Sequence, residues 1–124
     1  MRTKVSNQRG FTLVEIMIVT SVIGLLAAIA IPNFIRARYT AQMNTCINNL
    51  RMIDGALQRW ALDQKQAPDA LVAYQDISAY LKGELICPSG GRNFANSYLL
   101  QTVSDKPTCK QVKTAHILPP DTTN

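Results

Sequence analysis

The chain has 124 residues, of which 47% are hydrophobic and 17% charged, and its formal net charge is +5. Three of the basic side chains lie in residues 1–10, and the rest of the chain carries ten basic against eight acidic side chains, or +2. The composition beyond residue 10 therefore gives little support to a nucleic-acid-binding domain. The length excludes a large hydrophobic core.

The first predicted element is a membrane-spanning helix. Residues 16–35 contain no charge, and twenty helical residues extend about 30 Å, roughly the hydrocarbon thickness of a bilayer. Basic side chains flank the run, which weakly favours a cytoplasmic N-terminus; they are Arg2, Lys4 and Arg9 before it and Arg36 and Arg38 after it. A secretory signal peptide cleaved near residues 27–30 is the alternative, but the apolar run is longer than such a peptide carries.

A short motif, Gly-Phe-Thr-Leu-Val-Glu at residues 10–15, joins the basic leader to the apolar run. It resembles the class III signal of type IV prepilins and pseudopilins. The resemblance implies that an inner-membrane prepilin peptidase cuts after Gly10 and removes residues 1–10. It also implies that Phe11 becomes the N-methylated N-terminus and that Glu15 becomes the fifth residue of the mature subunit.

Glu15 is a carboxylate at the edge of a bilayer-spanning helix, where a charge is costly and usually has a partner. The positive end of the helix and a free amine at Phe11, four residues away on the same helix face, are candidate partners within the chain. The family resemblance implies a different partner, the Phe11 amine of an adjacent subunit during filament assembly. The alternative is that Glu15 lies among lipid headgroups.

Gly24 and Pro32 are poor helix residues within this span, and Pro32 removes the hydrogen bond to the carbonyl of Ala28. Type IV pilins carry a proline at this place and can unwind before it in filaments, so the resemblance implies a weak point here. The alternative is a mild kink, with Thr20 and Ser21 satisfying the freed backbone groups.

A second helical pattern covers residues 36–62. Its apolar residues recur at alternating three- and four-residue steps, which predicts one buried stripe packed against a local sheet; they are Tyr39, Met43, Cys46, Leu50, Ile53, Leu57 and Trp60. Residues 63–124 then form a small head. We therefore expect an α+β protein in which a long N-terminal helix, with a membrane-spanning half at 11–35 and an amphipathic half at 36–62, packs on a small antiparallel sheet.

The head is predicted to begin with a loop at residues 63–69. A short helix over residues 77–82 would follow, capped by Asp76 and ended by Gly83. Short apolar runs separated by turn residues then predict an antiparallel meander; the expected strands are 85–87, 97–100 and 107–112. The polar tail 119–124 is expected to be loose.

Three cysteines permit three single disulfides, and spacing alone does not choose among them. Cys46 lies in the apolar stripe and is expected to be a buried free thiol. Cys87 and Cys109 flank the predicted hairpin, which favours a disulfide between them. Residues 86–91, 107–109 and 116–119 also resemble a group of short pilin-like proteins with CPxGG, PxC and HxLP motifs, although here residues 92–97 intervene before the tyrosine that usually follows the glycines.

No catalytic constellation is recognisable, so an enzyme is not expected. His116 is the only histidine and is interpreted as structural or exposed. The cysteines lack CxxC spacing, so no redox site, zinc ribbon, metal site or cofactor is predicted, although loop carboxylates remain an alternative calcium site. Lys106, Lys110 and Lys113 are interpreted as a solvated strand face, with DNA contact as the alternative.

The resemblance implies a structural subunit of a type IV pilus or pilus-like filament. Its expected partners are copies of itself, the prepilin peptidase, an inner-membrane assembly platform with its motor, and membrane lipid before assembly. The expected location is the bacterial inner membrane, with a cytoplasmic N-terminus, and afterwards a periplasmic or extracellular filament. Two alternatives remain: a pseudopilin of a type II secretion system forming a short periplasmic fibre, and a membrane-anchored binding head that never polymerises.

Overall fold

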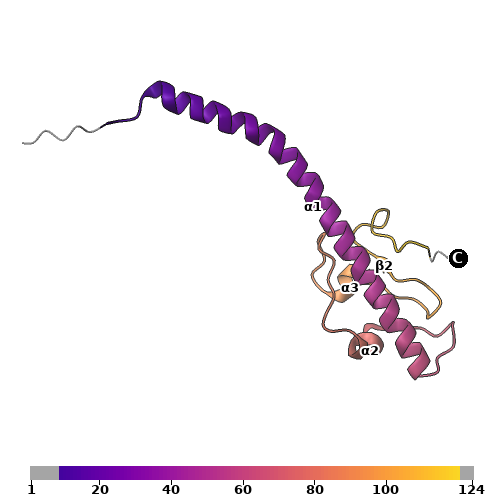
Figure 1. The fold of residues 1–124 in the computed structure, drawn as a ribbon. Helices are drawn as coiled ribbons and strands as arrows, with labels where there is room; N and C mark the ends of the chain where they lie inside the picture. The colour runs from indigo at the N-terminus through magenta and orange to yellow at the C-terminus, as the bar shows by residue number, and fades with distance from the viewer. Residues whose placement is uncertain (1–8, 121–124) are drawn as a thin grey trace, which may run out of the picture. The chain divides into compact units, whose positions relative to one another are not determined.

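The structure, a computed structural model, describes residues 9–120 (Figure 1). Most of the predicted leader and the last four residues of the tail lie outside the described residues. The chain divides into two compact units, Met1–Ala37 and Arg38–Asn124. Helix α1 (Leu13–Asp63) contributes residues to both, and the remaining elements belong to the second unit. A long apolar helix and a small antiparallel sheet confirm the expected α+β class.

Helix α1 begins two residues later than the sequence suggested. Thr12 caps it, since its hydroxyl accepts the backbone N–H of Glu15 at 3.2 Å and its carbonyl accepts that of Ile16 at 3.3 Å. Phe11 therefore precedes the helix. The expectation that a free Phe11 amine and Glu15 share one helix face concerns the chain after cleavage at Gly10, and it stays a prediction.

The helix is continuous through Gly24 and Pro32. Thr20 and Ser21 do not reach the carbonyl that Pro32 frees. Their hydroxyls donate to carbonyls one turn back, from Thr20 to Ile16 at 3.0 Å and from Ser21 to Met17 at 2.7 Å. Local unwinding in a filament stays a prediction.

In the second unit, α1 supplies one wall of the core, as the apolar periodicity predicted. Its buried residues are Cys46, Asn49, Leu50, Ile53, Ala56, Leu57 and Ala61. The helix ends at Asp63, which confirms the predicted end near residue 62. Tyr39 lies on the same stripe but is 69% exposed, so the prediction that it belongs to the buried stripe is wrong.

The short helix after the loop differs from its predicted bounds. Helix α2 (Tyr74–Ile77) continues into the 3₁₀ helix η1 (Ser78–Tyr80). Asp76 is the third residue of α2, where its carboxylate accepts the backbone N–H of Ala73 at 2.8 Å. The prediction that Asp76 is the cap residue is wrong, because Ala73 occupies the cap position and Asp76 lies within the helix. Gly83 has φ 154°, outside the ordinary range for other residues.

The sheet is smaller than the predicted meander. Strands β1 (Tyr98–Leu99) and β2 (Thr108–Cys109) pair antiparallel, with Tyr98 opposite Cys109. Helix α3 (Phe94–Ser97) occupies part of the expected turn region, capped by the Asn93 side chain. Residues 85–87 form no strand. The buried Asn49 side chain donates to the carbonyl of Ile86 at 3.1 Å. A side chain of α1 therefore makes the hydrogen bond that a neighbouring strand was expected to make.

Candidate functional site

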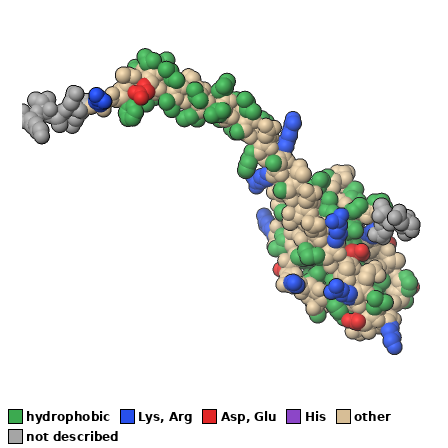
Figure 2. Space-filling model, in the orientation of Figure 1, with side chains coloured by type: hydrophobic (Ala, Val, Ile, Leu, Met, Phe, Trp, Pro, Cys, Tyr) green, Lys and Arg blue, Asp and Glu red, His purple; other side chains and the backbone are tan. Residues whose placement is uncertain are grey.

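The first candidate site is the apolar segment of the first unit, residues 11–35. Helix α1 satisfies the length and composition of a membrane-spanning helix: an 18-residue window near the N-terminus has a mean hydropathy of 2.5, and none of that window is buried within the structure. Figure 2 shows hydrophobic side chains along its visible face, with one acidic side chain near its start. An exposed apolar surface of this extent requires lipid or protein as a partner.

At the start of this segment, Phe11 and Glu15 are four residues apart in the sequence, but only Glu15 lies in the first turn of the helix. Phe11 is 82% exposed and lies before the Thr12 cap. Glu15 lies in the first turn of α1 and is exposed. A Cβ atom at Gly10 would meet nothing within 4 Å, so the described fold does not itself require a glycine there. Any requirement for Gly10 must come from another molecule.

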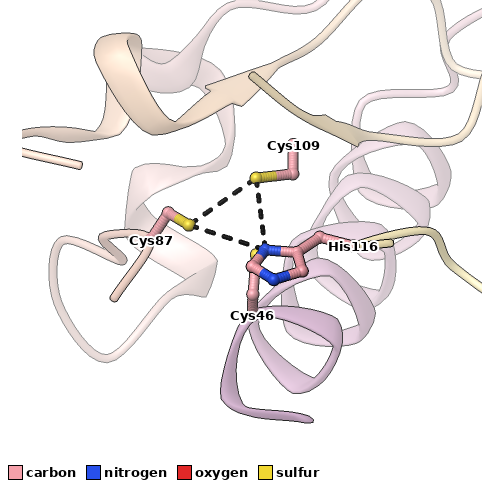
Figure 3. Close-up of side chains that lie close together, drawn as sticks. All are labelled: Cys46, Cys87, Cys109 and His116. Carbon is pink, nitrogen blue, oxygen red and sulfur yellow. Dashed lines mark hydrogen bonds between the residues drawn. The ribbon is translucent and has the colours of Figure 1, made fainter. Parts of the chain in front are cut away.

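The second candidate site is a buried cluster of three thiols and an imidazole in the second unit, which we call the Cys–His cluster: Cys46, Cys87, Cys109 and His116 (Figure 3). The three sulfur atoms and one ring nitrogen of His116 lie within 4.8 Å of one another. The Sγ atoms of Cys87 and Cys109 are 3.6 Å apart, and they lie 3.8 and 3.7 Å from His116 Nδ1. All four side chains are at least 95% buried.

Cys87 opens the turn Cys-Pro-Ser-Gly-Gly, whose last glycine allows a close approach. The backbone N–H of Gly91 donates to the carbonyl of Cys87 at 2.9 Å. A Cβ atom at Gly91 would overlap the Ser97 hydroxyl and lie 2.9 Å from the backbone N and O of Cys87. Ser97 in turn accepts the backbone N–H of Cys87 at 3.0 Å. Glycine is therefore required for this turn to fold over the cysteine.

The other members come from different elements. Cys46 lies on α1, with its sulfur 3.8 Å from the hydroxyl of Tyr98. Cys109 lies on β2, opposite Tyr98 in the ladder. His116 follows a turn in which its backbone N–H donates to the carbonyl of Val112 at 3.1 Å. The helix, the Cys87 turn, the sheet and the C-terminal segment thus meet at one point.

Burial favours the uncharged forms of these groups. It raises the pKa of the Cys46 and Cys87 thiols above the ordinary cysteine value and lowers the pKa of the His116 imidazole. A neutral imidazole has a lone pair on one ring nitrogen, and sulfur and imidazole nitrogen are ligands for zinc and related metals.

Comparisons with known proteins agree with the first candidate site. Residues 5–31 match the family described as the prokaryotic N-terminal methylation motif. The competence protein ComGC of Bacillus subtilis is 34% identical over 86 residues, which are 69% of this chain and 87% of that protein. The chain belongs to the type IV pilin and pseudopilin family. No solved structure matches it.

Other relatives from the pilin family are longer than this chain. The type II secretion system core protein G of Klebsiella pneumoniae is 37% identical over 62 residues, which are 50% of this chain and 44% of that protein. The type IV major fimbrial protein FimA of Dichelobacter nodosus is 33% identical over 91 residues, 73% of this chain and 53% of FimA. The chain thus spans about half the length of these two pilin-family relatives.

For this pilin-family chain, the Cys87–Cys109 disulfide stays a prediction. The structure has both cysteines unbonded, and their sulfur atoms are adjacent. Sequence reasoning missed the Cys–His cluster, because it assigned Cys46 to the core and His116 to a structural role. The available signal was the set of sparse CPxGG, PxC and HxLP motifs, each of which contains one cluster residue.

The three lysines do not share a strand. Lys106 and Lys113 lie outside β2, and Lys110 donates from Nζ to the carbonyl of Ala95 at 2.7 Å. The expected lysine strand face is therefore wrong, since the strand is only two residues long.

Proposed function

We propose that the chain is a structural subunit of a type IV pilus or pilus-like filament. In this proposal the leader, residues 1–10, is removed after Gly10, Phe11 is N-methylated, and the subunit polymerises through residues 11–35. One observation carries the proposal: the match to the N-terminal methylation motif, residues 5–31, extends into a helical segment that is apolar and exposed. The role is mechanical and includes no catalysis.

The driving force for assembly would be contact between apolar helices. Before assembly the segment would lie in the bilayer, with lipid covering its side chains. In the filament, segments of neighbouring copies would cover one another, so the apolar surface would stay out of water in both states. The amphipathic half at 36–62 and the head at 63–124 would remain outside the bilayer.

Glu15 would determine the axial register of the subunits. Lipid and packed apolar helices solvate a carboxylate poorly, so each Glu15 requires a cation on assembly. Phe11 precedes the Thr12 cap and is exposed, so cleavage after Gly10 would leave its amine available to another molecule. We assign the Glu15 carboxylate of one subunit to the Phe11 amine of the next.

The further partners belong to the same proposal. They are a prepilin peptidase, an inner-membrane assembly platform with its motor, and membrane lipid. The chain would reside in the bacterial inner membrane with its N-terminus in the cytoplasm, and after assembly in a periplasmic or extracellular filament.

A second candidate is a pseudopilin of a type II secretion system, which the similarity to core protein G favours. It would use the same assembly chemistry in a short periplasmic fibre. A gene neighbourhood with a secretin and secretion components would favour this candidate, whereas retraction and twitching genes would favour a pilus. A membrane-anchored head that never polymerises is the third candidate, and full retention of the leader in monomeric material would favour it.

The test is Glu15→Ala with Asp69→Ala, an exposed loop carboxylate of the head, as the matched control. Glu15→Ala is expected to be processed normally and to remain in the membrane as monomers, while the control assembles. Filaments are counted by electron microscopy of sheared cells, and processing is read from intact mass. Abundant normal filaments from processed Glu15→Ala would reject the role assigned to Glu15.

A further inference from the structure

The distances in the Cys–His cluster agree with those of a tetrahedral metal site. With Zn–S bonds of about 2.3 Å and Zn–N bonds of about 2.0 Å, a tetrahedral ion places two sulfurs about 3.8 Å apart and a sulfur and a nitrogen about 3.5 Å apart. The three measured separations among Cys87, Cys109 and His116 are 3.6, 3.8 and 3.7 Å. Cys46 Sγ completes the set within 4.8 Å (Figure 3).

The chemistry of the donors selects the metal. Three sulfurs and one imidazole nitrogen form one of the usual ligand sets of structural zinc, whereas calcium and magnesium prefer oxygen. All four side chains of the cluster are buried. Burial of every ligand is expected for a closed structural site, whereas a catalytic zinc site keeps one coordination position open. We propose that Cys46, Cys87, Cys109 and His116 bind one zinc ion that holds the head together.

Two hydrogen-bond donors beside the sulfurs would compensate part of the charge that the thiols acquire when a metal ion displaces their protons. A backbone N–H of Ser89 donates to Cys87 and stabilises its charged form. The Tyr98 hydroxyl accepts a hydrogen bond from Asn49 at 2.9 Å, which leaves its own proton available to a Cys46 thiolate 3.8 Å away. Three thiolates and Zn²⁺ carry a net charge of −1, and donors of this kind compensate it.

The reaction is balanced without electron transfer. Three thiols lose three protons, which pass to solvent, and three Zn–S bonds and one Zn–N bond form. A Cys87–Cys109 disulfide would instead require an oxidant to remove two electrons and two protons. A disulfide would also leave the Cys46 thiol and the His116 imidazole buried beside it, with no metal ion to bind.

A zinc ion would explain how the head stays folded with so few residues in helices and strands. The sheet has two strands of two residues, and the helices α2 and α3 have four residues each. The ion would connect α1, the Cys87 turn, β2 and the C-terminal segment at one point. A small core commonly requires such a cross-link.

The test uses the full chain, purified in detergent through a tag without histidine, from cells supplied with zinc and without chelator. Elemental analysis should give about one zinc per chain. Alkylation after unfolding with a chelator should label all three cysteines without prior reduction. A Cys87–Cys109 disulfide in peptide mass mapping, together with only traces of zinc, would overturn the proposal. This test needs no variant. Its failure would leave the proposed function as a filament subunit unaffected, because that function does not depend on zinc.

Variants then assign the ligands. Cys46→Ser and His116→Gln should lower the zinc content at least about tenfold, because a three-ligand site binds more weakly. His116→Cys should bind about as much zinc as the unmodified chain, since four thiolates also bind zinc. Ile53→Val, a change in the same core that leaves all four ligands, is the matched control and should keep its zinc. Full zinc content in Cys46→Ser and His116→Gln would contradict the assignment.

Discussion

Gly91 tests how the turn around Cys87 is built. Gly91→Ala adds one methyl group where a Cβ atom has the closest contacts of any described glycine, and Gly55→Ala adds the same group on an exposed part of α1, where a Cβ atom would meet nothing within 4 Å. The two variants therefore share one chemical change in opposite environments. We expect opposite effects on the stability of the head.

The magnitude follows from the contacts at each position. At Gly91, the methyl group would displace the Ser97 hydroxyl, which accepts from the Cys87 N–H at 3.0 Å and donates to the Asn93 carbonyl at 2.7 Å. Two lost hydrogen bonds cost about 2 kcal/mol, and the overlap with the Cys87 backbone costs about 1–3 kcal/mol more. At Gly55, a better helix former should add about 0.5–1 kcal/mol.

Trp60 provides the assay, because it is the only tryptophan and packs against the core of the head. Thermal unfolding of the full chain in detergent should be followed by its fluorescence. For a unit of this size, 1 kcal/mol corresponds to about 4–8 °C. Gly91→Ala should lower Tm by at least about 10 °C, and Gly55→Ala should raise it by about 2–8 °C. Equal Tm values for Gly91→Ala and the unmodified chain would refute the assigned role of the close approach.

Three further predictions concern the core and the leader. Asn49→Ala should cost about 2–3 kcal/mol, because it removes the hydrogen bonds to the Ile86 carbonyl and to the buried Tyr98 hydroxyl; urea unfolding measures it, and a loss below about 0.5 kcal/mol would contradict the contact. Leu57→Ala should cost about 2–5 kcal/mol, while Leu62→Ala, at a position 78% exposed, should change stability by less than about 0.5 kcal/mol in the same measurement; similar losses in both would argue against the assigned core. Gly10→Val should leave the fold unchanged but keep residues 1–10 on the chain, a mass difference seen in intact mass spectra, and normal cleavage would disprove the assigned site.

The long helix was predictable from sequence because its signals are local. The uncharged run marks its first half, and the apolar repeat marks its second half down to Asp63. The helix starts two residues later than predicted, and the N-terminal end of the buried stripe differs, since Tyr39 carries the right periodicity but lies before the first buried position, Cys46. Periodicity shows which face a residue occupies, and it does not show where the neighbouring elements begin.

The head was less predictable because its structure depends on contacts between distant segments. Residues 85–87 have the composition of a strand, but a side chain from α1 binds them. Residues 93–96 have the composition of a turn, so the sequence did not predict the four-residue helix α3. The Cys–His cluster combines residues from 46 to 116 without the short spacings by which zinc sites are recognised. Only the three-dimensional structure brings these four side chains together.

The most direct test of the account is the native molecule itself. Intact-mass and N-terminal analysis of material sheared from cells should be combined with electron microscopy. The account predicts chains that begin at a methylated Phe11 and that form filaments. Chains that still begin with Met1, in preparations that contain no fibres of any length, would contradict it.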